Sequence, residues 1–140
     1  MLNEIKSMPM VALRGMAVIP EMLIHFDVSR SRSVEAVQKA MHSKEQQIFL
    51  VAQRELSIEN PEQKDVYEIG TVATVKQIAK MSKNIIRVLV VGEKRARLLN
   101  VEQMDPYMLA EVEILEEEEQ VEEENLKDNL EAKTLQQLFF

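Results

Sequence analysis

Several residue types that commonly carry chemistry are scarce in this chain. Its 140 residues include no cysteine and no tryptophan, only three glycines, and 4% aromatic residues. Without cysteine, a disulfide framework and a thiolate zinc site are excluded. The sequence GxxxxGK[ST] and the sequence GxGxxG are both missing, so a phosphate-binding nucleotide loop is not expected. The longest apolar stretch, residues 85–91, is interrupted by Arg87 and is too short to span a bilayer.

The sequence also offers few candidates for catalysis or metal binding. The two histidines, His25 and His42, are not spaced as a metal-binding pair, and no cysteine can complete a zinc site. Glu111 and Glu113 share one face of an expected strand, where carboxylates are more often solvated than catalytic. We therefore expect no catalytic residue, cofactor-binding residue or metal ligand in this chain.

The net charge of −7 comes from one short segment. Residues 116–124, EEEEQVEEE, contain seven glutamates, and without them 17 acidic residues balance 17 basic ones. Balanced charge does not indicate a surface for nucleic acid. Like charges at this density oppose compaction, so we interpret the segment as a linker or the start of a helix.

Apolar periodicity and turn residues predict a fold dominated by antiparallel strands. The expected strands are residues 8–13, 22–28, 48–52, 66–79, 85–91, 95–101 and 108–115. Gly92 is expected to turn the chain, a phase shift near Gly70 and Ala73 predicts a bulge, and Asp105-Pro106 is expected to end a strand. These elements predict an α+β fold built on a small twisted sheet or a partly open barrel.

Two helices are expected in addition to the strands. Val34, Val37 and Met41 share one helix face after the second strand, with Ser33 as the expected N-cap. Residues 121–140 contain no proline or glycine and are rich in good helix formers. The last three residues are large and apolar, so we expect a fragment that was cut within a longer helical region.

An interaction module is the favoured class of function. Nine methionines supply adaptable apolar side chains, and several of them flank the turn between the first two expected strands. An exposed apolar loop indicates binding. The predicted contact residues of this loop are Met16, Val18, Ile19, Pro20, Met22 and Leu23.

Two more specific interpretations of the chain stay open. The ladder of Leu126, Leu130 and Leu138 is compatible with a self-association module. Arg95 and Arg97, on one face of an expected strand, are compatible with RNA binding. Clustered aromatic side chains, which RNA-binding surfaces use to stack bases, are missing, so RNA binding is the weaker alternative.

Several stretches of the chain, in order, resemble the amino-terminal domain of the ATP-dependent Lon proteases. They are PMVALRG (9–15), VIP (18–20), DVSR with SVEA (27–36), IFLVAQ (48–53), YEIGTVA (67–73) and VLVVGEKRAR (88–97). Ser29 and Val91 differ from the Gly and Glu that are usual in the family. No single stretch is diagnostic, but the order and spacing of all of them are specific, and they cover about residues 8–117.

The resemblance implies a PUA-like, β-rich pseudo-barrel with one inserted short helix in residues 1–117. An acidic linker and a truncated C-terminal helix would follow in residues 118–140. The implied function is non-catalytic: recognition of exposed apolar segments of unfolded or damaged proteins, and support of a cytoplasmic homo-oligomer, a hexamer for the parent chain. ATP, Mg and a Ser-Lys dyad are implied only for the rest of that parent chain. No nucleic-acid or membrane partner is expected.

Overall fold

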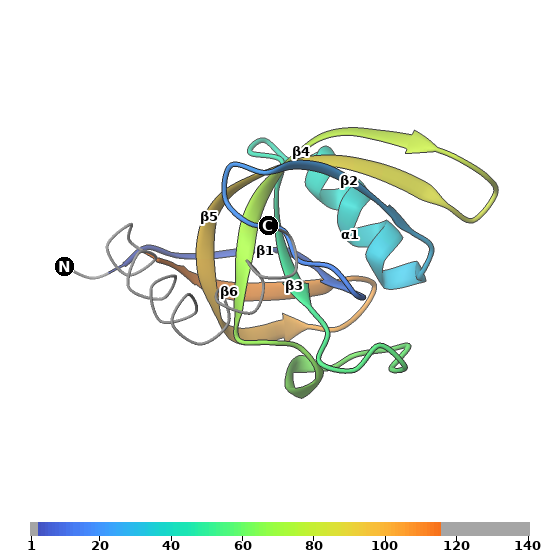
Figure 1. The fold of residues 1–140 in the computed structure, drawn as a ribbon. Helices are drawn as coiled ribbons and strands as arrows, with labels where there is room; N and C mark the ends of the chain where they lie inside the picture. The colour runs from blue at the N-terminus through green and yellow to red at the C-terminus, as the bar shows by residue number, and fades with distance from the viewer. Residues whose placement is uncertain (1–2, 116–140) are drawn as a thin grey trace, which may run out of the picture.

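The computed structural model describes residues 3–115, which form a β-rich fold with one α-helix (Figure 1). In chain order the elements are β1 (Ile5–Leu13), β2 (Leu23–Val28), α1 (Ser31–Met41), β3 (Gln47–Ala52), the 3-10 turn η1 (Gln63–Asp65), β4 (Ile69–Lys80), β5 (Ile86–Gln103) and β6 (Met108–Ile114). The predicted β-rich class and the single helix inserted after the second strand are confirmed. The predicted C-terminal helix and acidic linker lie outside the described residues.

The strands form one sheet that closes into a barrel. Their order is β2-β5-β4-β3-β1-β6, and an additional pairing of β5 with β6 completes the ring. β1 and β3 are parallel, whereas the other pairs are antiparallel. A parallel pair needs a long crossover, and here β2 and α1 supply it. Figure 1 shows α1 beside the barrel, near β2 and the projecting hairpin of β4 and β5.

β5 is one continuous strand of 18 residues, so the predicted turn at Gly92 is wrong. Gly92 stays in the sheet and pairs with Ala73, while the preceding β4 residue, Val72, pairs with Lys94. The shift leaves Glu93 as an extra residue on β5, which is the pattern of a β-bulge. The bulge predicted near Ala73 is therefore confirmed. Gly92 lies beside the extra residue on β5, a position where glycine is common.

Alternate residues of the central strands pack into two separate cores. Met10 and Phe49 belong to the core inside the barrel, which we call the barrel core. Their neighbours Val11 and Ile48 belong to a second core beneath α1, which we call the helix core. β1 and β3 are thus buried on both faces, and this explains why their sequences are almost continuously apolar.

α1 begins three residues earlier than predicted. Its N-cap is Arg30, which has extended backbone angles (φ −69°, ψ 139°), and no side chain caps the first turn. Ser33, the expected N-cap, instead lies inside the first turn and is only 4% exposed. Serines alternate with arginines from Ser29 to Ser33, so the residue types alone do not decide which serine precedes the helix.

Candidate functional site

The loop between β1 and β2, residues 14–22, is held in place by backbone hydrogen bonds. The hydroxyl of Thr71 donates a hydrogen bond of 2.5 Å to the carbonyl oxygen of Val18. The N–H of Glu21 donates one of 2.8 Å to the carbonyl oxygen of Gly92. These bonds join the loop to β4 and β5, so its second half, from Val18 onward, has a fixed position.

The loop also packs directly on the β5 bulge. A Cβ atom at Gly92 would lie 2.1 Å from the carbonyl oxygen of Ile19 and 3.3 Å from the Cα of Pro20. Both of these are backbone atoms, so no side-chain rotation could relieve the contact. The missing side chain at Gly92 therefore allows the loop to approach the sheet this closely.

A cavity that we call the apolar groove lies between residues 17–19 of this loop, the end of β3 and the start of β4. Its volume is about 520 Å³, and Leu50 and Ile69 are among its apolar lining residues. Ile19 and Tyr67 line it as well, and they are 48% and 47% exposed. The guanidinium of Arg54 lies 4.8 Å from the centre of the Tyr67 ring, within the range of a cation–π contact. The groove thus presents exposed apolar surface on a rigid frame.

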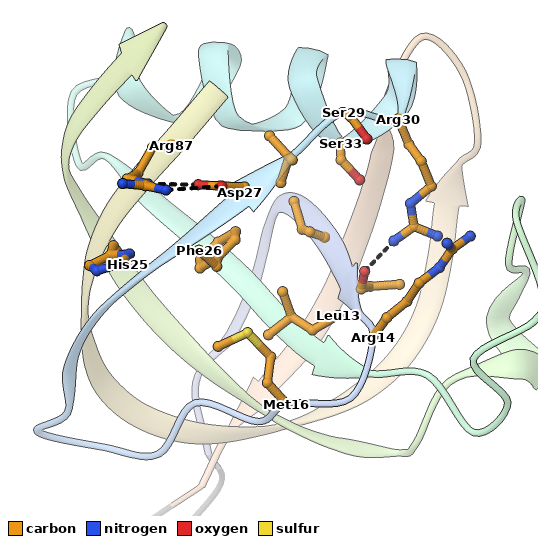
Figure 2. A pocket seen from close by; sticks show the side chains of 13 residues that line it. Leu13, Arg14, Met16, His25, Phe26, Asp27, Ser29, Arg30, Ser33 and Arg87 are labelled. Atoms are coloured by element: carbon orange, nitrogen blue, oxygen red, sulfur yellow. Dashed lines mark hydrogen bonds and ion pairs between the residues drawn. The ribbon is translucent and has the colours of Figure 1, made fainter. Parts of the chain in front are cut away.

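A second cavity borders the start of the same loop, and we call it the β1–β2 pocket (Figure 2). It has a volume of about 350 Å³ and lies between the end of β1, β2 and the start of α1. Leu13, Met16 and Phe26 give it an apolar part. Figure 2 shows the guanidinium groups of Arg14 and Arg30 side by side at another part of its lining.

Two of the three arginines that line this pocket, Arg14 and Arg30, contact neutral oxygens. Arg30 donates hydrogen bonds to the carbonyl oxygen of Ala12 and to the side-chain oxygen of Gln53. Arg14 donates one to the carbonyl oxygen of Ile58. Burial lowers the pKa of Arg30 below its ordinary value, and the nearby charge of Arg14 lowers it further. Arg14 and Arg30 therefore lie close together, and within residues 3–115 neither forms an ion pair with a carboxylate.

The carboxylate that lines the β1–β2 pocket is Asp27, and it is already paired. Nε and Nη2 of Arg87 donate hydrogen bonds of 2.8 and 3.2 Å to its two oxygens. These hydrogen bonds, with the attraction between the charges, hold the pKa of Asp27 below its ordinary 3.8. The pair therefore stabilises the fold above the pKa of Asp27 in the unfolded chain, and this contribution is lost as the pH falls through the lower folded value.

Replacing Arg87 with glutamine is expected to raise the pKa of Asp27 toward 3.8, because the bidentate donor is lost. A carboxyl-carbon NMR titration between pH 2 and 6 would measure the change. Glu45 is the internal control, because Lys6 lowers its pKa through a separate ion pair and that shift should stay. An unchanged titration of Asp27 in the Arg87→Gln chain would contradict the assignment. Both side chains of the pair are well exposed, so the effect on stability should be small.

The six predicted contact residues do not form one surface. Val18 is only 4% exposed and belongs to the helix core, so its side chain is not available to a partner. Met16 and Met22 are half-buried and pack against the same core. Ile19 lines the apolar groove, and Leu23, 64% exposed, lies on β2 away from both cavities. Only part of the predicted patch therefore coincides with a cavity.

Sequence reasoning missed Tyr67 and Arg54, which lie together at the groove. Tyr67 was expected inside a strand, but β4 begins only at Ile69, which leaves the tyrosine exposed before it. Arg54 follows β3, and nothing in its local sequence indicates a tyrosine partner thirteen residues later. The long loop between them returns the chain to the same place, and Arg54 also binds the backbone of Val66.

The basic residues assigned to the RNA-binding alternative occupy different surroundings. Arg97 forms ion pairs with Glu68 at 3.0 Å and with Glu113 at 3.6 Å. Arg95 lines the apolar groove. The leucine ladder of the self-association alternative lies outside the described residues. Within residues 3–115, no group of three His, Cys, Asp or Glu side chains could hold a metal ion, and the helix is too short to cross a membrane.

Comparison with known protein families identifies this arrangement. The family model described as the ATP-dependent protease La (LON) substrate-binding domain matches residues 7–139. The chain belongs to the Lon substrate-binding domain family. The predicted family resemblance is thereby confirmed, although the boundary predicted at residue 117 stays a prediction.

Relatives of this Lon domain are found among bacterial Lon proteases. The chain is 47% identical to the Lon protease of Desulforamulus reducens over 116 residues, which are 83% of this chain and 14% of that protein. It is 35% identical to Lon protease 1 of Bacillus subtilis over 126 residues, 89% of this chain and 16% of that protein. The chain therefore spans only a small share of the length of these relatives.

Solved structures confirm the fold of the Lon domain. The N-terminal domain of a Mycobacterium avium complex Lon protease matches with a TM-score of 0.60 at 20% identity, over 79% of this chain and 54% of that one. A Lon N-terminal domain protein from Xanthomonas campestris matches with a TM-score of 0.58 at 16% identity, over 79% and 60%. At these identities the likeness concerns the fold alone.

Proposed function

We propose that this chain is a non-catalytic substrate-recognition domain of an ATP-dependent Lon protease, and that it binds exposed apolar segments of unfolded or damaged proteins. The observation that carries the proposal is the apolar groove, with Ile19 and Tyr67 half exposed on a fixed frame. Burying one such side chain contributes about 1.5–3 kcal/mol. A few apolar side chains of a bound polypeptide could therefore supply useful affinity without a specific sequence.

The surroundings of the groove support binding rather than ordinary packing. The loop that carries Ile19 is fixed by Thr71 and Gly92, so little order has to be gained on binding. The contact with Arg54 orients the ring of Tyr67. Aromatic and arginine side chains are the ones that most often dominate protein interfaces.

The proposal extends to the parent protein. There, ATP, Mg and a Ser-Lys dyad would serve unfolding and peptide hydrolysis in other parts of the chain, while this domain captures substrates and supports a cytoplasmic homo-oligomer. The support is the family membership and the small share of the relatives that the match covers.

The test is a titration of a permanently unfolded reporter polypeptide against the unmodified chain and its variants. Ile19→Ser and Tyr67→Ser should each weaken binding by about tenfold or more, since each removes apolar area from the groove. Fluorescence anisotropy of a labelled reporter would give the dissociation constants. Backbone NMR shifts should map to the groove.

Met81→Ser is the matched control, because Met81 is an exposed apolar residue in the turn between β4 and β5 and lines neither cavity. It should leave the affinity unchanged. Equal losses for Met81→Ser and Tyr67→Ser would mean that the reporter binds apolar surface indiscriminately. Full affinity in the Ile19→Ser and Tyr67→Ser variants would reject the groove as the binding site.

A further inference from the structure

We propose that the β1–β2 pocket binds the C-terminal carboxylate of a polypeptide whose last side chain is apolar. The proposal rests on the proposed function, because the ligand is a polypeptide of the same class. It concerns a different cavity and a different chemistry from the apolar groove, so the two can fail separately.

Charge is the first argument for an anionic ligand. The guanidinium groups of Arg14 and Arg30 lie side by side in Figure 2, and their recorded hydrogen bonds go to neutral carbonyl and amide oxygens. The one acidic side chain among the lining residues, Asp27, gives its two oxygens to Arg87. A carboxylate placed between the two arginines would relieve their repulsion and accept charge-assisted hydrogen bonds.

The start of α1 supplies a second and independent argument. Its first turn has no side-chain cap, which leaves the positive end of the helix beside the pocket, and Ser33 is the residue of α1 that lines it. Ser33 lies in this turn, is 96% buried, and has no hydrogen bond recorded for its hydroxyl among the described residues. Figure 2 shows this hydroxyl directed into the pocket, on the side of the two arginines. The oxygen of this hydroxyl is not among the fully buried atoms that have no partner, so it is reached through the pocket and can donate a hydrogen bond to a carboxylate.

The shape of the pocket identifies the carboxylate as that of a chain terminus. Leu13, Met16 and Phe26 form an apolar part of the same cavity of about 350 Å³. In a C-terminal residue, the carboxylate and the side chain leave the same Cα, so one can reach the arginines while the other packs on the partly exposed Met16, beside the more buried Leu13 and Phe26. An aspartate or glutamate side chain would fill only the charged part.

The neighbouring strand offers a place for the rest of the bound chain. β2 pairs with β5 along one edge, and no strand pairs with its other edge among residues 3–115. Residues 25–28 of β2 line the pocket. A polypeptide that enters the pocket could therefore add its backbone to this edge, which is a common mode of peptide recognition.

The experiment compares three fluorescein-labelled, unstructured peptides of one sequence in binding to the full chain. The first ends in leucine with a free carboxylate, and the second ends in leucine amide. The third also ends in leucine amide, but an aspartate precedes the leucine and supplies a side-chain carboxylate. We expect the free acid to bind about 10- to 100-fold more tightly than either amide, as charge-assisted hydrogen bonds are lost with the terminal carboxylate. Equal binding of acid and amide, or of the acid and the aspartate peptide, would overturn the proposal.

Variants assign the effect to the pocket. Arg14→Gln and Ser33→Ala should weaken binding of the acid and leave binding of the amide unchanged, and neither removes a contact of the core. Arg32→Gln is the matched control, because it removes one positive charge from the same helix turn but Arg32 pairs with Asp105 outside the pocket. An equal loss with Arg32→Gln would show a general charge effect and overturn the assignment. Circular dichroism of each variant checks that it is folded.

The unfolded reporter separates this inference from the proposed function. If the reporter binds through the groove while acid and amide peptides bind equally, only the C-terminal site is rejected. If the acid is preferred but groove variants bind the reporter normally, only the groove is rejected.

Discussion

Replacing Phe49 with alanine should lower the free energy of unfolding by about 3–5 kcal/mol, a large share of the stability of an ordinary domain. Phe49 is fully buried in the barrel core, and it is the largest side chain there. The strands of the closed barrel are hydrogen-bonded to one another, so they cannot move freely into the space that the phenyl ring of Phe49 would leave. Urea unfolding followed by far-UV circular dichroism would measure the change, since the chain has no tryptophan for fluorescence.

Leu56→Ala is the control for this prediction. Leu56 is 57% exposed, so the same type of truncation should change stability by about 0.5 kcal/mol or less. A loss below about 1 kcal/mol for Phe49→Ala would contradict a tightly packed barrel core.

A second substitution tests the packing around the same ring. A Cβ at Gly70 would lie 2.7 Å from the Phe49 ring and 2.5 Å from the carbonyl oxygen of Leu50. Gly70→Ala should therefore lower the free energy of unfolding by less in the Phe49→Ala chain than in the unmodified chain, because the clash with the ring is gone. Additive costs would mean that the ring and Gly70 do not touch.

Replacing Gly92 with alanine should displace the loop between β1 and β2 and weaken binding of the unfolded reporter. The new Cβ would collide with the backbone of Ile19, so the loop must move and lose its hydrogen bonds to β5. We expect about 1–3 kcal/mol of lost stability, the usual cost of overpacking. Reporter affinity should also fall, because Ile19 would leave its position in the groove. Urea unfolding and the reporter titration would measure the two effects.

Gly15→Ala is the matched control in the same loop. Gly15 has a φ of +69°, but a Cβ there would contact nothing within 4 Å. The substitution should lower the free energy of unfolding by about 1–2 kcal/mol, because alanine is strained in the left-handed backbone conformation. The half of the loop from Val18 onward should stay in place. Its reporter affinity should therefore stay close to that of the unmodified chain. Normal reporter binding by the Gly92→Ala chain would contradict the role of the bulge.

Local patterns predicted most of the fold because they report which residues are buried. Short apolar runs located the strands, and Asp105-Pro106 correctly separated β5 from β6. They could not show that Gly92 continues a strand, since a glycine at a bulge and a glycine at a turn look the same in sequence. They also could not show that β1 and β3 are neighbours, because that pairing depends on the crossover through α1.

The candidate site was less predictable because it is formed by residues from distant segments. Ile19 was predicted for contact and lies at the groove, but its neighbour Val18 is drawn into the core by the hydrogen bond from Thr71. Arg14 and Arg30 are separated by sixteen positions and by β2, so only the folded chain shows them together. Each of these residues has an ordinary local sequence, and its function depends on its neighbours in space.

The pairing of β1 with β6 has a consequence for how the domain is made in the cell. Ile5 pairs with Glu113, so β1 leaves the ribosome long before its partner β6, which lies near the end of the described residues. At about 5–20 residues per second, synthesis of the intervening hundred or so residues takes roughly 5–20 s. During that time Met8 and Met10 have no closed barrel to enter. A domain that we propose captures unfolded chains is therefore, while it is being translated, itself a chain with exposed apolar segments.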